Sequence, residues 1–183
     1  MFSRVQLAFA ATTAALVVSP GAAQAASPYS PLDEQLLQSS IQGDRFEIAG
    51  GKIAEAKAVT PAVRALGVRL VRDHSKSLHE AIAVAHRLGI DVPAAPSTTE
   101  EWELKTIAPM SDEPFDAAYA YLEVQDHKHD IEETNMEIEH GLNAAVRALA
   151  RTDLPVLRTH LRLSKQALWA IPGTWPPEPA ASR

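Results

Sequence analysis

Hydrophobic residues recur every three or four positions along four long stretches of the chain. In the second stretch, one histidine continues a series of apolar residues: Val63, Leu66, Leu70, His74, Leu78, Ala81, Ala85 and Leu88. This spacing is the period of an α-helix with one buried face. No stretch shows the alternation of period two that is typical of a half-buried β-strand. The pattern therefore predicts an all-α protein.

Prolines and caps divide this pattern into separate helices, because proline is excluded from helix interiors. Expected N-caps are Asp33, Thr60, Ser111 or Asp112, and Asn143. The predicted long helices are Asp33–Ala58, Pro61–Leu88, Glu113–His140 and Asn143–Ala170. Pro155 is expected to kink the last helix or to split it in two.

A long connection over residues 90–113 separates the first helix pair from the second. It contains one short amphipathic stretch, Thr99–Ile107, for which Trp102 and Ile107 are the expected anchors. Two tight helix pairs joined by a long crossover predict a ferritin-like four-helix bundle over residues 31–171. The alternative is an up-and-down bundle with one large loop. The Pro-rich residues 172–183 are predicted to be a disordered tail.

The first 25 residues have the pattern of a signal peptide. Arg4 precedes an apolar run from Val5 to Val18, and Ala23-Gln24-Ala25 provides a cleavage pattern of small residues. The run is shorter than the about 20 residues that a membrane-spanning helix needs. No other segment is apolar enough to span a membrane. We therefore expect a soluble mature protein in the periplasm or the medium.

Composition removes several classes of function. The 183 residues include 17 Lys and Arg against 23 Asp and Glu, and the net charge of −6 argues against a general nucleic-acid binder. The absence of cysteine excludes thiol catalysis, an iron–sulfur cluster and a cysteine-based zinc site. Nucleotide-binding, GxSxG and HExxH motifs are also missing. We therefore predict no catalytic residue and favour a non-enzymatic function.

Three histidines lie on the apolar faces of three different predicted helices. His74, His127 and His160 each fall within roughly 5 Å of a helix midpoint at about 1.5 Å per residue, and Glu47 reaches the same height. Glu123, four residues before His127, shares that residue's face. Imidazole and carboxylate groups can bind iron, zinc, manganese or copper. The predicted metal ligands are Glu47, His74, Glu123, His127 and His160.

The alternative is a structural polar layer, in which the histidines hydrogen-bond one another or Glu47 and fix the helix register. A standard di-iron site is not supported, because Glu-x-x-His pairs are missing: Val71, Val124 and Leu157 occupy the glutamate positions. Asp73 and Asp126 directly precede histidines and therefore point elsewhere on their helices. They are poor ligand candidates, but they could orient a histidine on an adjacent helix.

The remaining polar groups are expected at the surface. These are His79, His86, His129 and His140, together with the acidic stretch 131–140. A partner-binding module would instead present an exposed apolar patch, for which Trp102 and Trp169 are the candidates.

Four segments of the chain resemble one known family. They are LLQSSIQGDRFEIAGGKIA, VRLVRDHSKSLHE, FDAAYAYLEVQDH and LPVLRTHLRLSKQAL, and they are similar to the landmarks of the exported bacterial family called domain of unknown function 4142. The resemblance covers roughly residues 31–170, with one departure at Glu123, where an apolar residue is usual. It implies a ferritin-like fold and export, but no activity. It therefore leaves two hypotheses: a metal-binding bundle for metal or oxidative-stress handling, and a structural or partner-binding module.

Overall fold

The computed structural model describes residues 27–173, and in this part of the chain the regular structure is entirely helical. The helices are α1 (Pro31–Lys57), α2 (Pro61–Leu88), α3 (Thr98–Ile107), α4 (Asp112–His140) and α5 (Ala144–Trp169). The all-α prediction is confirmed. The predicted signal peptide, and the predicted tail beyond residue 173, lie outside the described residues. Among the helices described, none is both long enough and apolar enough to cross a membrane.

The helix ends follow local capping chemistry. The Ser30 hydroxyl accepts a hydrogen bond from the backbone N–H of Asp33, whose carboxylate accepts one from the Ser30 N–H. This capping box makes Ser30 the N-cap, so the prediction of Asp33 is wrong: the reciprocal bonds place the cap three residues earlier. The Asn143 side chain caps α5 as predicted, accepting from two backbone N–H groups.

Pro155 does not split the last helix, because α5 continues through it without a break. A proline inside a helix leaves the carbonyl four residues earlier without its helical donor. Here Pro155 and Arg151 are both exposed, so water can hydrate that carbonyl. The helix therefore tolerates the proline, and its buried face, which includes His160, continues without interruption.

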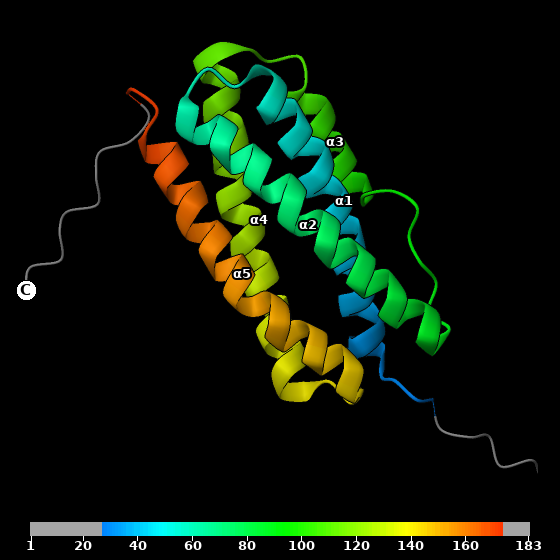
Figure 1. Ribbon diagram of the computed structural model, residues 1–183. Coiled ribbons are helices and arrows are strands. Elements are labelled where there is room, and N and C mark those ends of the chain that lie inside the picture. Colours follow the sequence, from blue (N-terminus) through cyan, green and yellow to red (C-terminus); the bar gives the residue numbers. More distant parts are fainter. Residues whose placement is uncertain (1–26, 174–183) are drawn as a thin grey trace, which may run out of the picture.

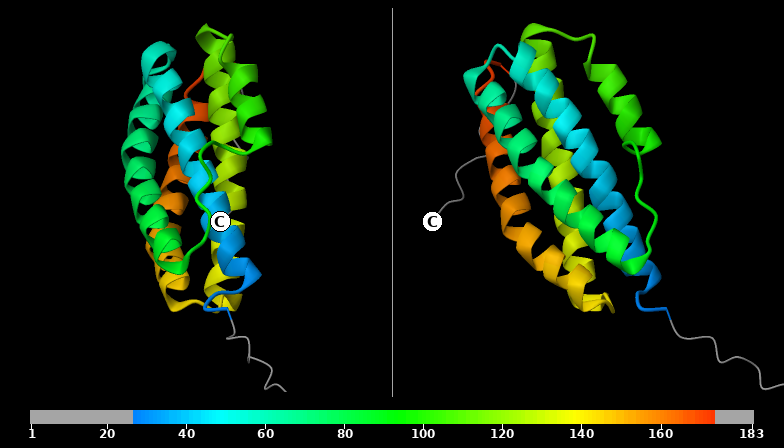
Figure 2. Two further views of the ribbon diagram at one scale, coloured as in Figure 1. Left: turned by 90° about the vertical axis from the view of Figure 1, so that its right-hand side faces the viewer. Right: turned by 45° about the vertical axis from the view of Figure 1, so that its right-hand side comes forward.

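The four long helices lie side by side, and α3 lies outside them against α1 and α4 (Figures 1 and 2). α2 and α4 run in the same direction, which the long connection through α3 makes possible (Figure 1). Ile107 anchors α3, with 2% of its surface exposed. Trp102 was predicted to be a second anchor, and this is wrong: it is 65% exposed because α3 turns another face toward α1 and α4.

Two glycines bring α1 and α2 into close contact. A Cβ atom on Gly51 would lie 2.8 Å from the backbone oxygen of Gly67, and one on Gly67 would lie 2.7 Å from the oxygen of Gly51. Real Cβ atoms do not approach so closely, so the two backbones can touch only because both residues lack a side chain. This contact fixes α1 against α2 a few residues from Glu47 and His74.

The hydrophobic core has two halves. One cluster joins Leu66, Leu70 and Phe115 near one end of the helices, and the other joins Leu37, Ile41 and Val146 near the opposite end. A layer of buried polar or charged residues lies between these halves: Asp44, Glu47, His74, Glu123, His127, His160 and Ser164. A buried polar layer costs free energy unless its groups find partners. This layer is therefore the candidate functional site.

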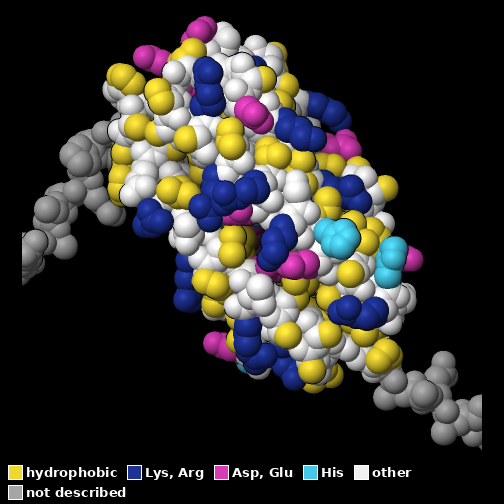
Figure 3. All heavy atoms as spheres, in the orientation of Figure 1, with side chains coloured by type: hydrophobic (Ala, Val, Ile, Leu, Met, Phe, Trp, Pro, Cys, Tyr) yellow, Lys and Arg dark blue, Asp and Glu magenta, His cyan; other side chains and the backbone are white. Residues whose placement is uncertain are grey.

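The surface carries the remaining histidines. His79, His86, His129 and His140 are all exposed, as predicted. Figure 3 shows histidine side chains at the surface of the face that α2 presents, among dispersed basic, acidic and apolar groups. One part of the surface prediction is wrong: Glu137, in the acidic stretch 131–140, is completely buried. Its side chain packs beside Gly141 and Asp33 at the end of α4.

Candidate metal centre

Three imidazole rings from three helices meet in the polar layer. His74 comes from α2, His127 from α4 and His160 from α5. Their ring centroids are 5.0–5.7 Å apart, and at most 5% of each residue is exposed. The predicted convergence of these rings in one cross-section is therefore confirmed.

The outer nitrogens of two rings are held by carboxylates on neighbouring helices. Nδ1 of His74 lies 2.8 Å from an oxygen of Asp44 on α1. Nε2 of His160 lies 2.9 Å from an oxygen of Asp73 on α2. Arg69 and Arg72 also pair with Asp73. Burial raises the pKa of Asp73, but its bonds with Arg72, His160 and Arg69 outweigh burial and hold that pKa well below its usual range. An ionised Asp73 only accepts hydrogen bonds, so Nε2 of His160 carries the hydrogen.

The third ring is held by its own helix. Nδ1 of His127 lies 2.8 Å from the backbone oxygen of Glu123, one turn earlier in α4. A carbonyl oxygen accepts but never donates, so Nδ1 carries the hydrogen and Nε2 keeps its lone pair. The tautomer of His127 is thus set by the backbone.

The inner nitrogens are the unusual feature of the layer. Nε2 of His74, Nε2 of His127 and Nδ1 of His160 are all buried, and none has a hydrogen-bond partner in residues 27–173. One nitrogen from each ring lies within 4.8 Å of the other two. A zinc ion bound to nitrogen at about 2.0–2.1 Å would need only a small inward movement of the rings. The chemistry of the triad therefore fits a transition-metal ion.

The three histidines differ in their pKa values and therefore in their protonation at neutral pH. Burial and the charge of His74 lower the pKa of His160 to about 4. Burial, together with the charges of the other two rings, lowers the pKa of His127 well below its usual value. Burial also opposes a proton on His74, but the hydrogen bond and charge of Asp44 outweigh it, so the pKa of His74 is raised. At neutral pH, His127 and His160 are therefore neutral imidazoles with lone pairs to donate.

Carboxyl groups occupy the other side of His127. Glu47 Oε1 and Glu123 Oε2 lie 3.5 and 3.7 Å from its Nδ1. Burial raises the pKa of Glu47 well above its usual value, and the charges of Glu123 and Asp126 raise it further. Burial raises the pKa of Glu123 to about 7. In the absence of a cation, Glu47 therefore keeps its proton at neutral pH, and Glu123 is about half protonated.

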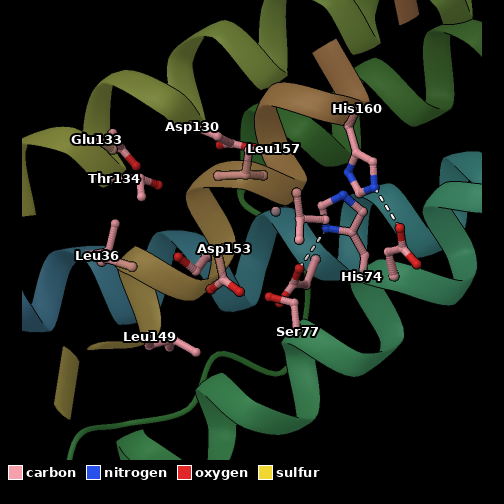
Figure 4. Close-up of a pocket in the computed structure, with 16 residues that line it drawn as sticks. Leu36, His74, Ser77, Asp130, Glu133, Thr134, Leu149, Asp153, Leu157 and His160 are labelled. Atoms are coloured by element: carbon pink, nitrogen blue, oxygen red, sulfur yellow. Dashed lines mark hydrogen bonds and ion pairs between the residues drawn. The ribbon is translucent and has the colours of Figure 1, made fainter. Parts of the chain in front are cut away.

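A cavity of about 50 Å³ leads toward the histidines. His74 and His160 line its inner part, and Asp130, Glu133 and Asp153 lie along it (Figure 4). No lysine or arginine is among its lining residues, all of which lie in the described helices. Burial, followed by the charges of Asp44 and Glu80, raises the pKa of Asp153 to about 7. An acidic lining of low dielectric attracts cations and repels anions.

The structure places every predicted ligand in the polar layer and adds one further ligand candidate, Asp126, and one partner of a histidine, Asp44. His74, His127 and His160 form the triad, while Glu47 and Glu123 lie on its carboxyl side. Asp73 orients a histidine on the adjacent helix, as expected for such an acceptor.

Asp126 was judged a poor candidate for the inward site, and it lies outside the triad. It groups with Glu47 and His127, because α3 covers that side of α4 and creates a second interior there. Asp44 was missed. It is three residues before Glu47, a spacing that places both on one helix face and that could have indicated it.

Comparisons with known proteins address the fold and the family. The crystal structure of a DUF305 fragment from Deinococcus radiodurans is similar to this chain, with a TM-score of 0.68 and 17% identity over 78% of this chain and 98% of that one. At this identity the likeness shows the fold alone. A search of curated proteins finds no match. The family described as Domain of unknown function (DUF4142) matches residues 18–167, most of the sequence, and the chain therefore belongs to that family.

Proposed function

We propose that this protein is an exported metal-binding module, a ferritin-like four-helix bundle that holds one transition-metal ion between His74, His127 and His160. The observation that carries the proposal is the set of three buried inner nitrogens without partners. A nitrogen left without a partner in the interior costs free energy, and a metal ion satisfies all three at once when it displaces the proton of His74.

The ligand set favours copper or zinc among the metals considered. Two neutral imidazoles, and a third that gives up its proton on binding, suit Cu²⁺ and Zn²⁺, whereas Mn²⁺ prefers oxygen ligands. The hydrogen bonds from the outer nitrogens to Asp44, Asp73 and the Glu123 carbonyl support the same reading, because such partners fix ring orientation at metal sites. Oxygen ligands for a fourth position are close, since the acidic cavity reaches His74 and His160.

The proposed role is binding and handling of metal outside the cytoplasm, without catalysis. The pattern of residues 1–25 supports export. The cavity supports exchange with the surroundings, because its acidic lining would concentrate cations near the two histidines. A role in oxidative-stress handling would follow if the bound ion were kept from uncontrolled redox reactions.

The second candidate is a structural polar layer with no ligand. It is favoured by the interhelix hydrogen bonds of His74 with Asp44 and of His160 with Asp73, which join α1 to α2 and α2 to α5. Such bonds would fix helix register even in the absence of metal. The two candidates differ in what occupies the inner nitrogens.

Metal analysis of untagged protein separates the candidates. We expect about one Cu²⁺ or Zn²⁺ per chain and a melting temperature that rises when either ion is added, because an ion that binds only the folded state stabilises it. The double variant His74→Ala, His127→Ala should lose both effects.

The matched control is the double variant His79→Ala, His86→Ala, which removes two exposed histidines from α2. It should keep the wild-type metal content and thermal shift. Wild-type protein that is free of metal, and whose melting temperature ignores added copper, zinc, iron and manganese, would contradict the proposal and favour the structural layer.

A further inference from the structure

A second group of ligand atoms lies beside the Nδ1 edge of His127. Glu47 on α1 and Glu123 on α4 are completely buried, and Asp126 on α4 is half-buried. One oxygen of Glu47, one oxygen of Asp126 and a nitrogen of His127 lie within 4.8 Å of one another. The oxygen Oε2 of Glu123 lies 3.7 Å from Nδ1 of His127. The helices thus bring three carboxyl groups to one point.

These carboxyl groups lack protein donors. Both oxygens of Glu47, both of Glu123 and Oδ2 of Asp126 are buried with no hydrogen bond of ordinary geometry in the described part of the chain. No lysine or arginine in residues 27–173 forms an ion pair with any of them. Buried carboxylates are normally paired or bound to a metal, so this group requires either protons or a cation.

A phenolic oxygen is aimed at the same group. The hydroxyl of Tyr119 is buried without a hydrogen-bond partner, although the residue is only 1% exposed. Its ring and Oε1 of Glu123 both lie beside Gly50, at 3.3 and 3.8 Å from where a Cβ of that residue would be. Tyr119 and Glu123 therefore lie side by side next to Gly50.

The helix α3 adds acidic side chains on this side of the molecule. α3 packs against α1 and α4, on the side of Asp126. Glu100 and Glu103 of α3 feel the charge of Asp126, which adds to the effect of burial in raising their pKa values. α3 thus places two acidic side chains near Asp126, and neither of them lines the cavity at His74 and His160.

We propose that Glu47, Glu123 and Asp126 form a second cation site, for a hard divalent ion such as Mn²⁺, beside the histidine triad and separated from it by the His127 ring. Oxygen ligands with net negative charge suit Mn²⁺, Mg²⁺ and Ca²⁺ better than they suit copper. The Nδ1 hydrogen of His127 is already donated to a backbone carbonyl, so the oxygens alone define the site. The inference goes beyond the histidine site, because it does not require the triad to bind metal.

The test loads untagged protein with one equivalent of Zn²⁺ and then titrates it with Mn²⁺, following the signal of free Mn²⁺ by electron paramagnetic resonance. Wild-type protein should bind one Mn²⁺ per chain. In Glu123→Gln and in Glu47→Gln the affinity for Mn²⁺ should fall by more than about 10-fold, the smallest loss typical of groups that only support a metal ligand. His74→Ala should lose Zn²⁺ and keep Mn²⁺.

The glutamine variants preserve shape, because glutamine resembles a protonated glutamic acid. Their metal-free melting temperatures should not fall below that of the wild type, so loss of Mn²⁺ binding would not reflect unfolding. Glu113→Gln, an exposed change on the same helix, is the matched control and should bind Mn²⁺ normally.

Wild-type protein that takes up no Mn²⁺ with the zinc in place, or Glu123→Gln and Glu47→Gln proteins with unchanged Mn²⁺ affinity, would overturn the second site. Failure of zinc to bind, with Mn²⁺ uptake intact, would overturn the histidine site alone.

Discussion

The buried polar groups on the two sides of His127 differ in their hydrogen bonding. On the histidine side, each ring has one nitrogen in a hydrogen bond and one inner nitrogen without a partner. On the carboxyl side, Glu47 and Glu123 have no ordinary hydrogen bond at either oxygen. The first side is organised in advance, with lone pairs on His127 and His160 and a proton on His74 that a metal ion would displace. The second side needs protons or a cation before its charge is balanced. The comparison teaches that one polar layer can contain two groups of side chains that differ in how their buried polar atoms are satisfied.

Asp33 and Glu137 form a carboxyl pair at the end of α4, at a place where no cation is expected. Burial acts to raise the pKa of Asp33, but hydrogen bonds from Ser30 and Asn143 outweigh it and lower the pKa to about 2. Burial, followed by the hydrogen bond and charge of Asp33, raises the pKa of Glu137 to about 8. One member of this pair takes the donors and the other keeps a proton. Beside His127, by contrast, neither Glu47 nor Glu123 receives hydrogen bonds of ordinary geometry, so neither is stabilised in its ionised form in this way.

The largest expected effect is the loss of Zn²⁺ affinity when one histidine of the triad is removed. In His160→Ala the affinity for Zn²⁺ should fall by at least about 100-fold, the upper end of the effects seen when only a supporting group is removed. In Glu47→Gln the Zn²⁺ affinity should remain close to the wild-type value. Competition with a coloured chelator measures both. Equal losses in the two variants would mean that the layer is a single site.

A smaller effect is expected from the carboxylate that orients His160. Asp73→Asn weakens the acceptor for Nε2 of His160, so the Zn²⁺ affinity should fall by about 10-fold while Mn²⁺ binding is unchanged. Asp91→Asn, an exposed substitution, serves as the control. An Asp73→Asn protein that binds Zn²⁺ as tightly as the wild type would show that this hydrogen bond does not support the metal site.

The smallest effect concerns the carboxyl pair at the end of α4. The pKa of Glu137 is higher in the folded state than its ordinary 4.5, so its stabilising contribution is complete below about pH 4.5 and is lost as the pH rises through about 8. Glu137→Gln removes this titration and can still donate to Asp33. At pH 8.5 the variant should melt at least about 2–4 °C higher than the wild type, which is the shift that 1 kcal/mol produces in a domain of this size.

Differential scanning calorimetry of Glu137→Gln and wild type at pH 5 and pH 8.5 checks this sign. The difference should be small at pH 5, where the wild-type Glu137 is protonated. A variant that is less stable at both pH values would contradict the account of the pair.

Much of the fold followed from local signals in the sequence. The bounds of α2 are those predicted, because Pro61 and Gly89 mark its two ends unambiguously. The start of α1 was misplaced by two residues, since Asp33 satisfies the same cap preference as Ser30 and only the reciprocal bonds separate them. The continuity of α5 through Pro155 depends on local solvation, which helix periodicity does not reveal.

The site was predictable where it depends on position along long helices, and less so where it depends on packing. The convergence of His74, His127 and His160 followed from matched heights and apolar stripes. The interior position of Asp126 depends on where α3 lies, and a short helix in a long connection has no register that sequence can fix. Metal binding by these residues stays a prediction.

X-ray absorption spectroscopy of untagged protein loaded with one equivalent of Zn²⁺ tests the central claim most directly. The account predicts three imidazole ligands with zinc–nitrogen distances of about 2.0–2.1 Å, and the loss of that imidazole signal in His160→Ala. A zinc environment made of oxygen ligands alone, or one that the His160 substitution leaves unchanged, would contradict it.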